Sequence, residues 1–167
     1  MKNRVATIFS WVVVAWICKV FLLSLPYKFS GHPDTQHIFG IIGLWMQDTV
    51  STDIGLWFAE HGATAVGSVE LLTSLLLLSP IVFFGLKKLN VMTKTPSRAL
   101  IHALGGLLSA GVMAGAMFFH LITPLGVEVL HNGQSDGGSL FYAAVSIFIF
   151  GLILAAVNGN IVRTKKV

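Results

Sequence analysis

The sequence predicts an all-α protein, an integral membrane four-helix bundle with a short interfacial helix in its first outer loop. Three observations support this prediction: the apolar composition, four long apolar stretches and the positions of the basic residues. Of the 167 residues, 54% are hydrophobic and 11% are charged, whereas charged residues make up about a quarter of a soluble domain. This composition excludes a soluble globule and a disordered chain, and we expect no binding to nucleic acid.

Each apolar stretch is long enough to cross a bilayer as a helix, because a core about 30 Å thick requires roughly 20 residues. The predicted spans cover about 5–25, 63–86, 99–123 and 139–162, and the second has a possible helical extension back towards Asp53. The first span differs from a cleaved secretory signal, because it is too long, Lys19 interrupts it and no small-x-small site follows. We therefore expect a single four-span domain over residues 1–167.

Basic residues at the span ends predict the orientation. Two precede the first span, four join the second to the third and three follow the fourth, which places nine of the 11 Lys and Arg on one side. Lys28 is in an opposite loop and Lys19 is inside a span. By the positive-inside rule both termini are cytoplasmic, and the loops at 26–62 and 124–138 face outward, in a bacterial inner membrane.

The segment 35–47 in the first outer loop is too apolar for a free loop. Ile38, Ile41 and Trp45 recur at helical spacing, after a candidate N-cap at Asp34. About 13 residues cannot cross a bilayer, so this helix is expected to lie at the interface. It either closes over the bundle as a lid or merely seals it against lipid headgroups.

Small residues form two stripes along the third span. Gly106, Ala110 and Ala114 recur every four residues, as do Gly111 and Gly115. Such stripes let helix backbones approach closely in a membrane, so we expect this span to be a central packing helix on both faces.

Charged residues inside the spans are the most informative candidates for a site. Lys19 and Glu70 are predicted at similar depth, and an ionised group there costs at least roughly 2.5 kcal/mol unless it is paired. One reading is structural: the two form an ion pair that fixes helix register, or Lys19 snorkels outward while Glu70 is protonated. The other is a polar anchor for a ligand or a proton. In the second case His120, Tyr27 and Lys28 would form the outer mouth of the same site.

The histidines match no strong metal-binding signature. His32 and His37 in one loop and His131 in the other could supply ligands, but their spacing is not that of an established metal site. One haem between His61 and His120 is geometrically conceivable. We expect neither metal nor haem.

Several segments resemble one family. LPYKFSG at 25–31, Glu70-Leu and the small-residue third span resemble the DoxX-like family of small bacterial four-helix membrane proteins. FHLITPLGVE at 119–128 and DGGSLFY at 136–142 are similar to one proteobacterial branch of it. The resemblance implies a redox context, since that family is associated with a quinone-linked thiosulfate-oxidising enzyme and an oxidative-stress assembly. With Cys18 as the single cysteine, any dithiol chemistry would belong to a partner.

The leading functional expectation is an inner-membrane subunit of a redox or oxidative-stress-linked system. It would bind quinone or another hydrophobic ligand between its helices, because such a ligand needs a few polar contacts in an apolar pocket. The expected ligand-binding residues are Lys19, Tyr27, Lys28, Glu70 and His120. The alternative is a non-enzymatic small-solute transporter or a scaffold that docks a periplasmic partner, assembled as a homo-oligomer. Whether any reaction is catalysed stays open.

Overall fold

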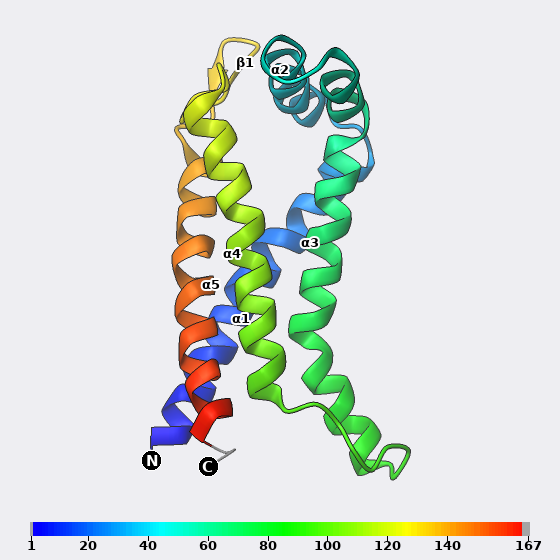
Figure 1. Cartoon of the computed structure of the whole chain (residues 1–167), viewed down its shortest axis with the longest axis vertical. Coiled ribbons are helices and arrows are strands. Elements are labelled where there is room, and N and C mark those ends of the chain that lie inside the picture. The colour runs from blue at the N-terminus through cyan, green and yellow to red at the C-terminus, as the bar shows by residue number, and fades with distance from the viewer. Residues whose placement is uncertain (1, 165–167) are drawn as a thin grey trace.

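A computed structural model describes residues 2–164 and confirms the all-α bundle (Figure 1). The helices are α1 (Lys2–Phe29), α2 (Pro33–Thr49), α3 (Thr52–Lys88), α4 (Arg98–Ile122) and α5 (Ser139–Thr164), and a short hairpin consists of β1 (Leu130–His131) and β2 (Gln134–Ser135). Within the described residues four helices, α1, α3, α4 and α5, are long and apolar enough to cross a membrane. The chain is a multi-pass membrane protein.

The two ends of the bundle differ in composition. The start of α1, the end of α5 and the connection 89–97 lie at one end, here called the terminal end (Figure 1). α2 and the β-hairpin lie at the opposite end, called the roof end. The described part of the terminal end is rich in basic residues, while Lys165 and Lys166 lie outside the described residues.

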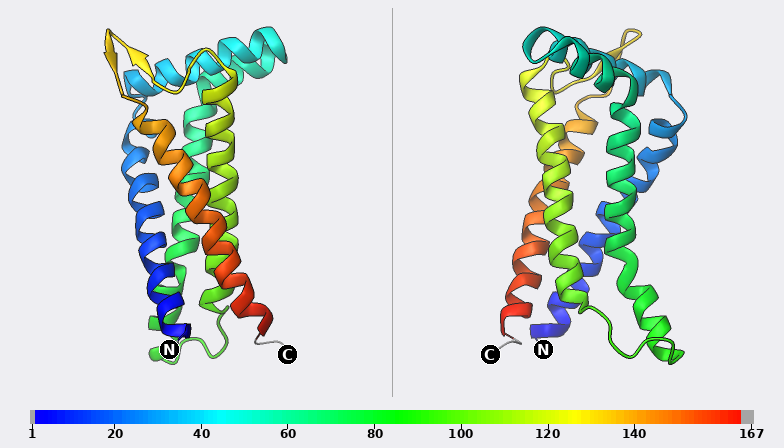
Figure 2. Two further views of the ribbon diagram at one scale, coloured as in Figure 1. Left: turned by 90° about the vertical axis from the view of Figure 1, so that its left-hand side faces the viewer. Right: turned by 45° about the vertical axis from the view of Figure 1, so that its right-hand side comes forward.

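The predicted surface helix is α2, and its partner is the possible extension of the second span back towards Asp53, which the structure contains as the start of α3. α3 is 37 residues long, and its first turns lie beside α2 across the roof end before the helix descends into the bundle (Figure 2). We call α2 and these first turns of α3 the roof. The predicted N-cap at Asp34 is wrong: the helix is capped by His32, whose ring nitrogen accepts from the Asp34 amide, because Pro33 takes the first helical position.

The two roof helices touch backbone to backbone at a pair of glycines. A Cβ built on Gly43 would lie 2.8 Å from the Gly55 carbonyl oxygen, and one on Gly55 would lie 2.5 Å from the Gly43 carbonyl oxygen. Any side chain at either position would push the helices apart. These glycines hold the start of α3 against α2.

The small-residue stripes of α4 have different environments. At Gly106 a Cβ would lie 2.6 Å from the Gly151 carbonyl oxygen of α5, so this stripe packs as predicted. At Gly111 and Gly115 a Cβ would meet nothing within 4 Å. The prediction of a second packing face is therefore wrong, because these two glycines border open space and not a neighbouring helix.

A packed apolar core fills the middle of the bundle. Ile17, Phe21, Leu77, Ile147 and Leu154 are all fully buried there. These residues come from α1, α3 and α5, and α4 contributes Met113 to the same cluster. All four spanning helices therefore pack against one another below the roof. The open space beside Gly111 and Gly115 lies between this core and the roof.

Candidate ligand site

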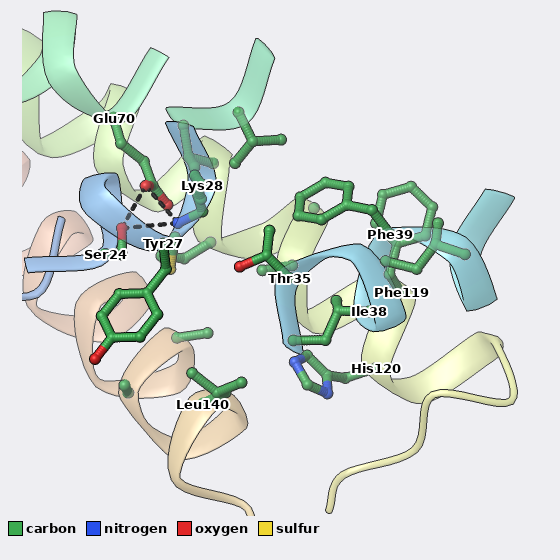
Figure 3. A pocket seen from close by; sticks show the side chains of 18 of the residues that line it. Ser24, Tyr27, Lys28, Thr35, Ile38, Phe39, Glu70, Phe119, His120 and Leu140 are labelled. Atoms are coloured by element: carbon green, nitrogen blue, oxygen red, sulfur yellow. Dashed lines mark hydrogen bonds and ion pairs between the residues drawn. The ribbon is translucent and has the colours of Figure 1, made fainter. Parts of the chain in front are cut away.

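A cavity of about 790 Å³ lies between the roof and the adjoining parts of the spanning helices. Its size is within the usual range of ligand pockets, about 300 to 1,000 Å³. All five helices contribute to the walls, which are mostly apolar. The polar and charged residues that line it are Ser24, Tyr27, Lys28, Asp34, Thr35, Glu70 and His120 (Figure 3).

A buried ion pair lies on the wall of this cavity. The Lys28 Nζ donates to Glu70 Oε2 at 2.6 Å and to the Ser24 hydroxyl oxygen at 2.8 Å (Figure 3). The one hydrogen of that hydroxyl has two acceptors within reach, the same carboxylate oxygen at 2.9 Å and the Phe21 carbonyl oxygen at 2.7 Å. The side chain of Lys28 is 16% exposed and that of Glu70 is 4% exposed. Ser24 and Lys28 are four residues apart on α1 and therefore share one face. Together these three residues form what we call the triad.

The predicted pairing of Lys19 with Glu70 is wrong, since Lys28 is the cation beside Glu70. Lys19 is exposed, its Nζ lies 5.7 Å from the centroid of the Trp16 ring, and it does not line the cavity. The predicted pair rests on the similar depth of Lys19 and Glu70 in the membrane. Which lysine reaches Glu70 depends instead on the side of α1 from which its side chain projects. Nine residues separate the two lysines, which is about two and a half turns, so they point to opposite sides of α1.

The triad keeps hydrogen-bonding capacity for a ligand. An ammonium carries three N–H donors, and two of those of Lys28 are used by Glu70 and Ser24. Both hydrogen bonds to the carboxylate fall on Oε2, and no described residue donates to Oε1. The site therefore offers one donor and one acceptor within an apolar surrounding, where each is worth more than in water.

His120 supplies a second polar group in the cavity. Its Nδ1 lies 2.7 Å from the Gly126 carbonyl oxygen, which can only accept, so Nδ1 carries the hydrogen. Nε2 is then the nitrogen left for a ligand. The ring is buried at the last turn of α4 and meets Phe141 edge to face, which fixes its orientation.

Tyr27 lines the same cavity from α1 but is half-exposed, with its ring against that of His32. Of the five predicted ligand-binding residues the cavity thus includes four, and Lys19 is the exception. Ser24 was missed. The signal available was its spacing of four residues before Lys28.

The mouth of the cavity is bridged by a histidine cluster. The Asp34 carboxylate, which lines the cavity, lies 2.6 Å from His131 Nδ1 on the β-hairpin. The ring of His37 stacks on that of His131 at 4.3 Å, and its Nε2 lies 2.8 Å from the Leu130 carbonyl oxygen. These contacts hold the hairpin against α2. No group of three or more metal-ligating side chains that could hold an ion occurs within the described residues.

Asp136 shapes the loop that carries the hairpin. Its carboxylate accepts from the backbone amides of Val129 at 2.8 Å, Gly138 at 2.9 Å and Leu140 at 3.1 Å. Partial burial raises the pKa of this carboxyl, but the hydrogen bonds from these amides and from the Ser139 hydroxyl outweigh it and hold the pKa below its ordinary value. The loop is therefore stabilised by an ionised acid.

Comparison of the chain with known protein families, characterised proteins and solved structures found no match.

Proposed function

We propose that this protein binds a hydrophobic, carbonyl-bearing molecule of the quinone class in the cavity beneath the roof. The observation that carries the proposal is the triad, a buried ion pair with one unused donor and one unused acceptor on the wall of an apolar cavity. A purely structural ion pair would be expected to be enclosed by packed side chains. This one borders about 790 Å³ of space.

A quinone matches the polar groups as well as the apolar ones. One carbonyl oxygen accepts the third N–H of Lys28, while the ring lies among the apolar side chains. The second carbonyl is served by a donor elsewhere in the cavity, the Tyr27 hydroxyl. In the reduced form the quinol hydroxyls donate, and Oε1 of Glu70 is the acceptor available. The triad can therefore hold either form.

The wider role that we propose is an inner-membrane subunit of a redox or oxidative-stress-linked system. Its support is the resemblance to DoxX-like proteins and the positive-inside distribution, which would place the roof end on the periplasmic side. Passage of a small solute is less well supported. The fully buried side chains of Phe21, Leu77 and Ile147 close the middle of the bundle below the cavity.

Co-purification tests the proposal directly. The protein is isolated in native-lipid nanodiscs, and the extracted lipids are analysed by mass spectrometry for quinones, with a thermal-shift titration by added quinone. We expect bound quinone and, at 100 times the Kd, about 2.7 kcal/mol of added stability. The absence of both from the wild type would refute the proposal.

A matched pair of variants assigns the site. Lys28→Met with Glu70→Leu replaces the ion pair by apolar side chains and is expected to retain the fold but lose quinone. Lys19→Met changes the same residue type on the same helix, outside the cavity, and is expected to keep quinone. Retention of quinone by the double variant would show that the triad is not its binding site.

A further inference from the structure

A second, smaller cavity opens beside the first. It has a volume of about 260 Å³ and lies between the end of α1, the start of α2 and the roof part of α3. Its rim consists of exposed residues, and its floor of buried or half-buried ones. The rim includes Ser30, Gly31, Gln36, Glu60 and Thr64.

The two cavities share a wall. Lys28, Thr35 and Phe39 line both of them, so Lys28 stands between the two cavities. On one side Lys28 faces the apolar ligand cavity. On the other it borders a space that is continuous with the exposed rim.

The second cavity has the character of a water site. A buried water occupies about 30 Å³ and needs two to four polar partners, and this cavity offers space for several. Partners are present in the Thr35 and Thr64 hydroxyls, the Gln36 amide and the exposed Glu60 carboxylate. Of the pair, Lys28 is the more exposed, 16% against 4% for Glu70, and Lys28 alone of the two lines the second cavity.

We propose that this second cavity is a water-filled vestibule through which the Lys28–Glu70 pair exchanges protons with the aqueous phase at the roof end. A proton passes from the Lys28 ammonium to the Glu70 carboxylate along their 2.6 Å hydrogen bond. The neutral amine then takes a proton from hydronium in the vestibule and leaves water. No electron is transferred, and the reverse sequence returns the proton.

The inference rests on the proposed function for its purpose, because protonation of a ligand oxygen beside Lys28 would draw on this route. The route itself is tested without any ligand. A protein that binds no quinone can still have the vestibule, and a protein that binds quinone can lack it, so the two failures are distinguishable.

Thiol labelling tests whether the vestibule holds water. In a Cys18→Ala background, Ala63→Cys places a thiol in the second cavity, and Val69→Cys places one on the same helix beside the first cavity, at a position 43% exposed on the lipid-facing surface of the span. A membrane-impermeant methanethiosulfonate is added to the roof-end side of sealed vesicles, and Thr64→Cys at the rim gives the reference rate. Ala59→Cys replaces Ala63→Cys if the latter does not fold.

We expect Ala63→Cys to react within about tenfold of the rim thiol and Val69→Cys to react at least about 100-fold more slowly, since the reactive thiolate forms in water and not in lipid. A rate for Ala63→Cys as low as that of Val69→Cys would overturn the vestibule.

Proton exchange is tested by NMR of the ¹⁵N-lysine-labelled protein, with Lys28→Arg used to assign the Lys28 signal. We expect a water exchange peak at the Lys28 Nζ that is lost when Ala63→Cys is blocked with a bulky reagent. A missing peak in the unblocked protein, or a peak that persists after blocking, would overturn the proposed route.

Discussion

Removing the lysine of the triad should destabilise the bundle far more than removing the other lysine of α1. Lys28→Met leaves the Glu70 carboxylate, 4% exposed, without its cation. Breaking a buried pair from one side costs about 3 to 5 kcal/mol. Because Lys28 is itself 16% exposed, the lower value applies, about 3 kcal/mol or roughly a 100-fold change in the unfolding equilibrium.

The complementary change should cost less. Glu70→Leu leaves an ammonium at the end of α1, which can still be solvated from the polar second cavity, so we expect about 1 to 2 kcal/mol. The double variant replaces both charges by apolar side chains and should fall within about 1 kcal/mol of the wild type. The singles would then be strongly non-additive.

Equilibrium unfolding in mixed micelles, followed by circular dichroism, measures the four free energies of this double-mutant cycle. The control cycle compares the wild type, Lys19→Met, Glu70→Leu and the double variant of Lys19→Met with Glu70→Leu. We expect its coupling energy to be near zero, since Lys19 lies beside Trp16 and away from the carboxylate. Additive losses in the Lys28 cycle, or coupling in the Lys19 cycle, would refute the assignment of the ion pair.

Three further predictions follow from individual contacts. Gly115→Leu should preserve or raise stability, by up to about 1 kcal/mol, since its side chain meets open space, and should exclude quinone from the purified protein. Gly106→Ala should lower the free energy of unfolding by about 1 to 3 kcal/mol, because its Cβ would lie 2.6 Å from the Gly151 carbonyl oxygen. Because the pKa of Asp136 is lowered in the folded state, its ionised carboxylate stabilises the fold fully above the ordinary carboxyl pKa of about 4. This stabilisation is lost as the pH falls through the lower folded-state pKa. The protection factor of the Val129 amide, which is its exchange rate relative to that of an unstructured amide at the same pH, should therefore fall on acidification, and Asp136→Asn should remove that pH dependence; an unchanged profile in the variant would contradict it.

The sequence by itself determined the number of membrane-spanning helices and the existence of a surface helix. These properties depend on the length of the apolar stretches. They also depend on the backbone N–H and C=O groups, which in lipid must form their hydrogen bonds within the same helix. The sequence also shows that most basic residues lie on one side of the membrane, because they occur at the ends of the spans that face that side. The possible extension of the second span back towards Asp53 is present, since α3 starts at Thr52 and its roof part precedes the span.

Only the tertiary structure decided which residues meet. Lys19 and Lys28 lie on opposite sides of α1, and the sequence contains no signal for which side faces inward. In a soluble helix an apolar stripe would mark the buried face, but a helix in lipid is apolar all round. The same uncertainty applies to the two glycine stripes of α4, of which one packs against α5 and the other borders the cavity.

The rotation of each helix about its axis is set by close packing with its neighbours, in contacts such as that of Gly106 with Gly151. Those contacts join residues far apart in the sequence, and each contributes only a small van der Waals energy. The triad depends on the rotations of α1 and α3 together. Lys28 and Glu70 could be identified in advance as candidates, but their pairing could not, because the sum of these contacts turns Lys28 toward Glu70.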